Sequence, residues 1–463
     1  MLAGGQVIAL AVGGVASILL ARTLKPAGFG TYSILSVGVS FASLIAIFGM
    51  DTHLISEMQR EHGDQRLYGR GFRFCLEITV LLCVPATVLA LAATNGVTRS
   101  ASLLAVVELA LTPFLLGRAV LLSRMQQGRE AGTGVANRLA LLTGVVLIAT
   151  LHVSPALAWM MAVSALAVAV EAILLRALAG PPVGWRHRLR SRHKQMLAAC
   201  WPLAASGIAV VAYNRLDQLL LAAFRGRSEV GTYAVAVNLA MLLNVISAVV
   251  YATTLPGVIE VCRDRQEAPA RRVVEDMALL MFLPGGLGIA VLAGAGGSIT
   301  RLLFGAAYQH DHALVAVLAF AELWVFVGTV LAAVLIAVDR RRALLVGTAS
   351  ALVIDVVLCL VLLQRYGAIA AAWASFVSYA AAALVAALAA REARRIARPL
   401  VKVTIKSGLA ALVGAIVGGT FHTLVPAIVA GSVAYVAVTA LLFNRELIRV
   451  IHRLVEGRAH FRP

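Results

Sequence analysis

The chain has 463 residues, of which 61% are hydrophobic and only 13% are charged. Soluble domains contain roughly 45–50% apolar and about 25% charged residues, so this composition cannot supply the polar surface that a soluble fold of this size needs. A single soluble domain, a disordered chain and a disulfide-rich secreted scaffold are therefore excluded, and a polytopic membrane protein remains. The net charge of +18 comes from cations that interrupt apolar runs, which is typical of orientation signals and lipid contacts rather than nucleic-acid binding.

Fourteen apolar runs, each near the length of about 20 residues that a spanning helix needs, are separated by polar clusters. Their richness in Ala and Leu predicts helices, because barrel strands alternate apolar and polar residues. The first run lacks the basic start of a signal peptide, so we expect it to be retained as a span. The predicted spans are 2–21, 31–50, 72–94, 101–123, 132–151, 155–176, 196–221, 231–255, 274–293, 312–338, 344–363, 368–390, 403–421 and 424–443.

The loops between these spans divide sharply by charge. When Arg73, Arg138, Arg176 and Lys406, which fall within the predicted bounds of a span, are counted with the adjoining loop, 31 of the 40 Lys and Arg residues belong to alternate loops and the C-terminal tail. Seven belong to the other loops, and Arg118 and Arg215 lie inside spans. Basic loops stay on the cytoplasmic side of a membrane. We therefore expect a multi-pass protein of the bacterial inner (plasma) membrane with both termini in the cytoplasm.

Several short patterns occur twice, about 200 residues apart. Gly30-Thr31-Tyr32 recurs as Gly231-Thr232-Tyr233. An arginine, an acid and a proline at successive spacings of four and eight residues occur as Arg73, Glu77 and Pro85 and again as Arg272, Asp276 and Pro284. Two further matches follow at an offset of 211 residues. Spans 1–6 and 7–12 are thus predicted to be two copies of one unit. Because six is even, both copies have one orientation, related by an axis along the membrane normal.

This repeat predicts two pseudo-symmetric six-helix lobes followed by two extra C-terminal helices. The predicted parts of the chain are an N-lobe, a basic cytoplasmic linker, a C-lobe, and finally spans 13 and 14 with a basic tail. Their residue ranges are 1–176, 177–195, 196–392 and 393–463.

Enzyme signatures do not occur in the sequence. No phosphate-binding loop is present, no cofactor motif is recognised, and no large outward loop could carry the catalytic residues of a glycan polymerase. The sequence His310-Asp311-His312 lacks a third ligand and predicts no metal site. Five cysteines without paired spacing predict free thiols. We therefore expect no enzyme activity, no cofactor and no metal.

Charged residues inside spans are costly and are functional candidates by default. The deep ones are predicted to face a cavity or a partner helix, whereas Glu171 is expected to snorkel or to meet Arg176. Two i,i+4 pairs near the cytoplasmic surface are expected to be structural, with a gate as the alternative. The deep candidates are Glu108, Arg118, Arg215, Asp217, Glu322 and Asp355, and the pairs are Arg73 with Glu77 and Arg272 with Asp276.

Arg215 and Asp217 are two residues apart and therefore point away from each other on a helix. The repeat maps them onto Gly14 and Ala16, and it maps Asp355 onto Gly144. Charges in one copy and small residues in the other are expected if a cavity between the halves binds something asymmetric. A buried interhelical Arg–Asp pair is the alternative.

Three segments resemble a known family. The segment from Ala21 to Tyr32, the pattern Arg215-Leu216-Asp217-Gln218 with the following Val230-Gly231-Thr232-Tyr233, and Arg365-Tyr366-Gly367-Ala368 resemble bacterial polysaccharide flippases. These flippases belong to the multidrug/oligosaccharidyl-lipid/polysaccharide exporter superfamily. The resemblance covers residues 4–392 and departs at the N-terminus, where the usual basic residues before span 1 are missing.

The resemblance implies a flippase for undecaprenyl-diphosphate-linked oligosaccharide, working by alternating access in cell-surface or exopolysaccharide biosynthesis. Its partners would be that lipid-linked substrate, anionic lipids, and a polysaccharide polymerase and co-polymerase. A diphosphate suits the planar fork of arginine, so Arg22, Arg118 and Arg215, with Asp217 and Glu108, are the substrate candidates. The candidates for ion coupling are Asp355, Glu322 and Asp217. A multidrug antiporter, a peptidoglycan precursor flippase and, remotely, a glycan polymerase are the alternatives.

The division of basic residues between loops predicts the topology. Reporter fusions should place 177–195, 256–273, 391–402 and 444–463 in the cytoplasm, because the basic loops resist translocation. A fusion in 177–195 that reports from outside the cell would contradict both the topology and the two-lobe repeat.

Overall fold

A computed structural model gives the fold, and in the described residues it contains helices and connecting turns without any strand. The all-α prediction is therefore confirmed. Within these residues, twelve helices are long and apolar enough to cross a membrane. The described residues are 2–60, 65–93, 95–183, 193–263, 267–308, 312–389 and 391–455.

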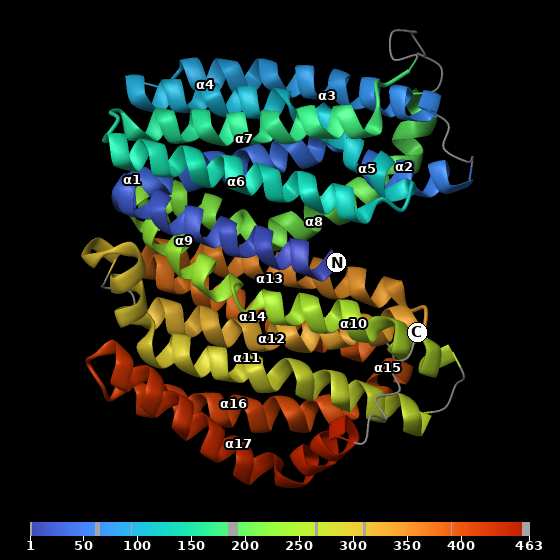
Figure 1. Ribbon diagram of the computed structural model, residues 1–463, viewed down its shortest axis with the longest axis vertical. Coiled ribbons are helices and arrows are strands. Elements are labelled where there is room, and N and C mark those ends of the chain that lie inside the picture. The colour runs from blue at the N-terminus through green and yellow to red at the C-terminus, as the bar shows by residue number, and fades with distance from the viewer. Residues whose placement is uncertain are drawn as a thin grey trace. The chain divides into compact units, whose positions relative to one another are not determined.

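The chain forms two compact units, Met1–Gly231 and Thr232–Pro463. The helices of the first unit are labelled in Figure 1, where α6 and α7 run side by side. They are α1 (Leu2–Ile47), α2 (Met50–Arg60), α3 (Gln65–Leu91), α4 (Gly96–Ala110), the 3₁₀ helix η1 (Thr112–Leu116), α5 (Gly117–Ser123), α6 (Gln127–Leu151), α7 (Ala156–Ala179), α8 (His193–Arg225) and the start of α9 (Arg227–Met241).

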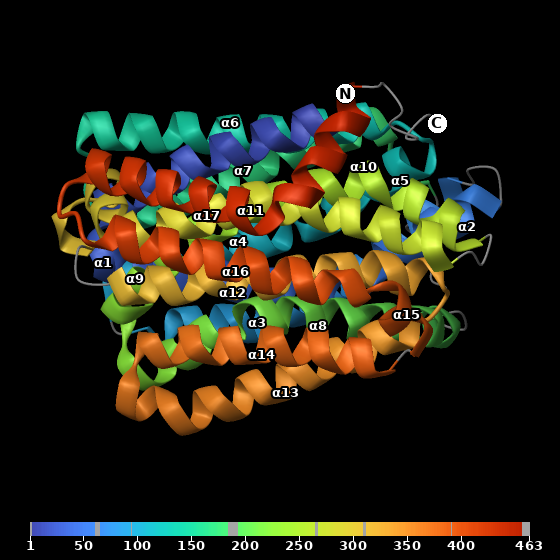
Figure 2. The same ribbon diagram turned by 90° about the horizontal axis from the view of Figure 1, so that it is seen from below.

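The second unit begins within α9 and continues to the C-terminus. In Figure 2, α13 and α14 lie side by side, as do α16 and α17. Its helices are α10 (Asn244–Arg263), α11 (Glu267–Phe304), the 3₁₀ helix η2 (Ala306–Tyr308), α12 (His312–Ala337), α13 (Arg341–Tyr366), α14 (Ala368–Ala389), α15 (Arg391–Ile396), α16 (Arg398–Gly419) and α17 (Leu424–Val455).

The first helix, α1, contains two spans. Its 46 residues would extend about 69 Å at 1.5 Å per residue, about twice the thickness of a bilayer core. The two halves meet at Lys25, whose φ of 58° is not helical. Pro26 accounts for this break, because the ring of a proline disfavours the helical conformation of the residue before it. The sequence predicted a loop over 22–30, whereas a single residue separates the halves.

Other spans are interrupted rather than joined. Helices α4, η1 and α5 together form one span, and helices α9 and α10 together form another. The 3₁₀ segment carries Pro113 at its start, which removes a backbone donor and breaks the α-helical pattern. Counting both halves of α1, and adding the 33-residue α8, the helices account for all fourteen predicted runs.

The boundary between the compact units differs from the boundary inferred from the repeat. Helix α8, the seventh span, packs on α1 and α2 and belongs to the first unit, whereas the repeat assigns 196–221 to the second copy. The two divisions rest on different criteria, contact and sequence, so the lobes inferred from the repeat stay a prediction. Residues 184–192 of the predicted linker lie outside the described part of the chain.

The two glycines of the repeated Gly-Thr-Tyr pattern touch each other within the first unit. A Cβ atom on Gly30 would overlap the carbonyl oxygen of Arg227, and one on Gly231 would overlap that of Pro26. Pro26 and Arg227 are themselves separated by the same 201 residues as the glycines. The contact is thus symmetric in sequence, which supports the offset on which the repeat rests.

The core of the first unit lies where α2, α3 and α5 meet. Met50 and Leu54 of α2 pack with Phe72 of α3 and Val120 of α5, all buried. Gly49 provides the turn into α2: its φ is +70°, and a Cβ would lie 2.7 Å from Leu203 of α8. Only glycine satisfies both the left-handed backbone and the close approach.

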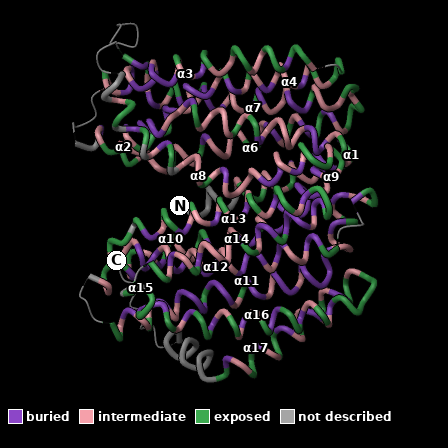
Figure 3. Tube along the Cα trace, turned by 180° about the vertical axis from the view of Figure 1, so that it is seen from behind, coloured by how far each residue is buried: buried purple, intermediate pink, exposed green. Residues whose placement is uncertain are grey.

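The second unit is built around α11, the helix with the largest buried share among its candidate spans (Figure 3). Near Pro284 of this helix, the Phe282 carbonyl accepts a hydrogen bond from Ser407 Oγ at 2.9 Å, and the Leu283 carbonyl accepts one from Tyr435 at 2.8 Å. These bonds attach α16 and α17, the two extra C-terminal helices. Gly286 makes room for them, because a Cβ there would lie 2.6 Å from both hydroxyls.

Enlarging Gly286 should therefore detach the C-terminal helices. We expect Gly286→Val to cost about 1–3 kcal/mol, the usual cost of overpacking, and to lower the temperature at which the purified protein unfolds. Gly328→Val is the matched control, because a Cβ on Gly328 of α12 meets nothing within 4 Å. Equal unfolding temperatures for the two variants would contradict this account.

Candidate functional site

In the first unit, α8 carries a buried polar strip. Asp217 is 5% exposed, and its Oδ1 accepts a hydrogen bond from the Gln218 backbone N–H at 2.7 Å. The Gln218 side chain is completely buried and accepts a hydrogen bond from Ser33 of α1 at 2.9 Å. Arg215 lies on the same helix and is half-buried. The sequence analysis selected the two charged residues and missed Gln218, because a neutral amide gives no charge signal.

Arg118 of α5 lies between two carboxylates. Its Nη2 lies 2.7 Å from Glu171 of α7, and its Nε lies 3.6 Å from Glu130 of α6. The expectation that Glu171 would snorkel or meet Arg176 is therefore wrong, because Glu171 is buried and its cation comes from another helix. Arg118 holds three helices together, and its role as a substrate ligand stays a prediction.

Arg138 was counted among the loop cations, but it lies inside α6. Its side chain passes Gly13 of α1, where a Cβ would lie 3.4 Å from Arg138 Cδ. The sequence could have identified Arg138 as a residue inside the membrane, because it lies within the predicted span 132–151. Arg138 therefore joins Arg118 and Arg215 as an arginine well inside a predicted span of the first unit, whereas Arg73 and Arg176 lie at span ends.

Glu108 of α4 accepts a hydrogen bond from Ser164 of α7 at 3.0 Å. The ring of Tyr32 from α1 packs against the cluster formed by Ala105 and Met161 of the same two helices. The Glu108 carboxyl is therefore held by a neutral hydroxyl at a place where three helices meet.

The second unit holds its acidic residues in the same manner. Glu322 of α12 is 5% exposed and accepts a hydrogen bond from Asn244 Nδ2 at 3.5 Å. Asn244 begins α10, next to the break between α9 and α10. Asp355 of α13 is 1% exposed and accepts a hydrogen bond from Ser378 of α14 at 3.4 Å. Both candidates for ion coupling are thus deep in the unit and touch neutral side chains of neighbouring helices.

Of the two predicted i,i+4 pairs, Arg73 and Glu77 of α3 form an ion pair at 2.8 Å. Arg272 and Asp276 lie on α11, where the preceding arginine, Arg271, pairs with Glu267 at 2.9 Å. The proposed gating role of both pairs is untested and stays a prediction. Arg22 lies on α1 and is exposed.

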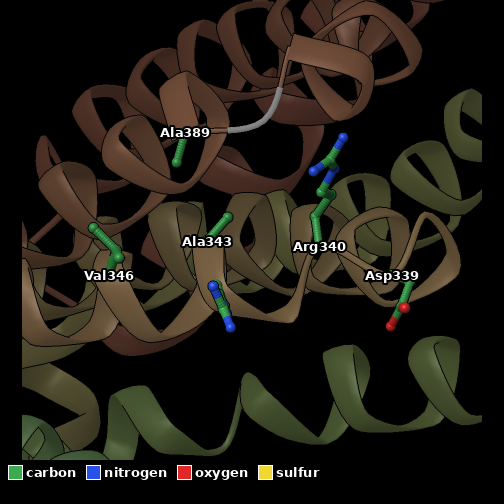
Figure 4. Close-up of a pocket in the computed structure, with 6 residues that line it drawn as sticks. Asp339, Arg340, Ala343, Val346 and Ala389 are labelled. Atoms are coloured by element: carbon green, nitrogen blue, oxygen red, sulfur yellow. The ribbon is translucent and has the colours of Figure 1, made fainter.

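Two cavities in the second unit are lined by arginines. One, of about 610 Å³, lies at the turn between α12 and α13 and reaches Ala389 at the end of α14 (Figure 4). The other, of about 370 Å³, lies on α15 and the start of α16. The first is lined by Asp339, Arg340, Arg342, Ala343, Val346 and Ala389, and the second by Arg391, Arg394, Arg395 and Arg398.

In the described part of the chain, no group of three or more His, Cys, Asp or Glu side chains could hold a metal ion. His310 and Asp311, considered in the sequence analysis, lie outside the described residues. All five cysteines have free thiols, as the spacing predicted.

A family model described as "Polysaccharide biosynthesis protein" matches residues 1–260, more than half of the chain. The chain belongs to this family. No curated protein matches it in sequence.

Solved structures extend the likeness of this family member over its whole length. The lipid II flippase MurJ, in an inward closed conformation, matches with a TM-score of 0.76 at 10% identity, over 96% of this chain and 99% of that chain. A multidrug-resistance MATE transporter of the MOP superfamily, facing inward, matches with a TM-score of 0.64 at 15% identity, over 84% of this chain and 95% of that chain. A MOP superfamily transporter from Pyrococcus furiosus matches with a TM-score of 0.56 at 15% identity, over 86% of this chain and 95% of that chain. The chain therefore has the MurJ and MATE fold, as the resemblance implied.

The position of Arg118 predicts a structural effect of its removal. Arg118→Ala leaves Glu171, whose side chain is 7% exposed, without its nearest cation. Because Arg118 itself is 45% exposed, we expect a loss of at most about 3 kcal/mol, the low end for breaking a buried pair. Thermal unfolding of the purified protein measures this loss, and the double variant Arg118→Ala/Glu171→Gln should recover most of it. Unchanged stability with lost transport would contradict the structural role and assign Arg118 to the substrate.

Proposed function

We propose that the protein moves undecaprenyl-diphosphate-linked oligosaccharide across the bacterial inner membrane, from the cytoplasmic to the outer leaflet. The observation that carries this proposal is membership of the polysaccharide biosynthesis family over residues 1–260. The fold of a lipid II flippase supports it, because both substrates would pair a polyprenyl tail with a phosphate-linked glycan.

The chemistry of such a substrate agrees with the residues inside the spans. A glycan needs hydrogen-bonding groups, and a diphosphate needs cations that can donate in pairs, which arginine does. Arg215 of α8 is the first candidate for the diphosphate, since it is half-buried one turn from the polar strip of Asp217 and Gln218. Arg22 and Arg118 are the second and third. Glu108 and Asp217 would then accept hydrogen bonds from sugar hydroxyls.

Transport by alternating access requires no covalent step, so we propose a transporter rather than an enzyme. Two similar six-helix lobes would rock about a central site. Asp355, Glu322 and Asp217 are the candidates for ion coupling, because all three carboxylates are buried and a bound cation would offset the cost of burying their charge. The pairs Arg73–Glu77 and Arg272–Asp276 would open and close the cytoplasmic side. Both termini would face the cytoplasm, and a polymerase and co-polymerase of the same pathway would receive the glycan.

A peptidoglycan precursor flippase is the second candidate, favoured by the TM-score of 0.76 with MurJ over 96% of the chain. A multidrug antiporter shares the fold, but an acid-lined cavity would favour export of cationic drugs, whereas the spans of this chain carry charges of both signs, such as Arg215 and Asp217. A genomic neighbourhood of glycosyltransferases would favour the first candidate.

Substitution of Arg215 tests the proposal. If Arg215 binds the diphosphate, Arg215→Ala should abolish glycan export in a null strain at unchanged protein level, because the variant lacks the guanidinium that would neutralise the phosphates. Arg215→Lys should retain part of the export, since it keeps the charge and loses the fork. Export of glycan and immunoblots of membrane protein are measured side by side.

Two outcomes would contradict this assignment. Normal export by a well-expressed Arg215→Ala variant would remove Arg215 from the substrate site. A fall in abundance for both Arg215→Ala and Asp217→Ala would make the pair structural. Glycan flipping by the purified protein in liposomes distinguishes oligosaccharide from peptidoglycan precursor, because each lipid-linked donor is added alone.

A further inference from the structure

We infer that the four-arginine cavity on α15 is a binding site for a membrane lipid whose headgroup carries two phosphate groups. The cavity, of about 370 Å³, is lined by Arg391, Arg394, Arg395 and Arg398. None of these residues belongs to the proposed transport site inside the spans, and the inference stands whether or not the chain moves a lipid-linked glycan.

The cavity is held in place by the rest of its unit. Arg271 of α11 donates from Nε to the backbone carbonyl of Arg395 at 3.1 Å, and from Nη2 to Glu267 at 2.9 Å. Glu267 also lies 3.9 Å from Arg395 Nη1. The short helix α15 is thereby fastened to the first turn of α11, and it also packs on α12 and α14. The arginines therefore project from a braced element.

The charge of this cavity calls for an anion. The segment 391–398 contains four arginines and one acid, Glu392. Each of the four cavity arginines is exposed. Glu267 offsets part of the charge of Arg395, but the remaining like charges repel one another unless a further anion lies between them. A guanidinium donates two parallel hydrogen bonds to a phosphate. Two phosphates can engage four such forks, whereas one phosphate leaves most of the positive charge unbalanced.

The position of the cavity favours a lipid over a soluble anion. It lies between the end of one candidate span, Ala368–Ala389, and the start of the next, Arg398–Gly419. Ends of spans lie at the depth of lipid headgroups, and the basic loops at this end are the ones predicted to face the cytoplasm. A volume of about 370 Å³ also falls within the range of small-ligand sites.

The larger cavity beside it extends the basic surface. Ala389 lines that cavity and lies two residues before Arg391. In Figure 4, Arg340 extends towards the side of Ala389, whereas the Asp339 carboxylate points the opposite way. This cavity therefore adds Arg340 and Arg342 to the basic residues near α15, with Asp339 as the one acid among its lining residues.

Native mass spectrometry of the purified full chain tests the site with four probes: a polyprenyl diphosphate without glycan, a diphosphatidyl phospholipid, a phospholipid with one phosphate, and inorganic diphosphate. The test variant is Arg394→Gln/Arg398→Gln, which spares Arg395 and its contact with Glu267. The matched control is Arg124→Gln/Arg129→Gln, which removes the same charge from another basic loop. Thermal unfolding of each variant is measured alongside.

We expect the test variant to bind both two-phosphate lipids at least tenfold more weakly than the unchanged chain, and the control to bind them equally well. The two-phosphate lipid that binds more tightly identifies the source of the headgroup. Arg398→Lys, which keeps the charge and loses the fork, should give an intermediate loss and covers the case in which the double variant unfolds.

Three results would overturn the inference. Equal weakening in the test and control variants would mean general attraction to a basic surface. Equal affinity for the one-phosphate phospholipid would remove the requirement for paired phosphates. Competition by inorganic diphosphate at the same concentration as the lipids would make the ligand a free anion instead of a lipid.

Discussion

The structure depends first on the absence of water in the core of a bilayer, where an unsatisfied backbone group costs several kcal/mol. The described spans therefore keep most of their backbone hydrogen bonds inside helices, and two of their breaks coincide with a proline. Pro26 ends the first half of α1, and Pro113 opens the 3₁₀ segment after α4. At the break before α10, Asn244 supplies the side chain that reaches Glu322.

Helices in lipid gain little from hiding apolar surface, so close approach of backbones and hydrogen bonds between helices must hold them together. The second unit shows both. Gly286 and Gly294 of α11 admit α16 and α17, with Gly294 lying against Ala415 and Gly418. Ser407 and Tyr435 then donate to carbonyls beside Pro284. Glycines and one proline therefore decide where the two C-terminal helices attach.

The ionisable groups inside the spans follow a common pattern. Glu108, Glu322 and Asp355 each accept a hydrogen bond from a neutral side chain of a neighbouring helix. Glu171 instead lies 2.7 Å from a cation, Arg118. A neutral donor compensates a buried carboxylate less than a cation does, which is the physical reason for proposing that these groups interact with ions or substrate hydroxyls.

The sequence by itself determined the membrane class, the helical fold, the fourteen apolar runs and the repeat, because composition and hydropathy are local properties that the bilayer reads directly. Only the tertiary structure decided that Glu171 meets Arg118 instead of Arg176, that Gln218 bonds to Ser33 and Asn244 to Glu322, and that α8 packs with the first unit. It also brought Arg391 and Arg398 together around one cavity. These features depend on the rotation and crossing of helices, which are set by packing between distant segments and leave no periodic signal in the sequence.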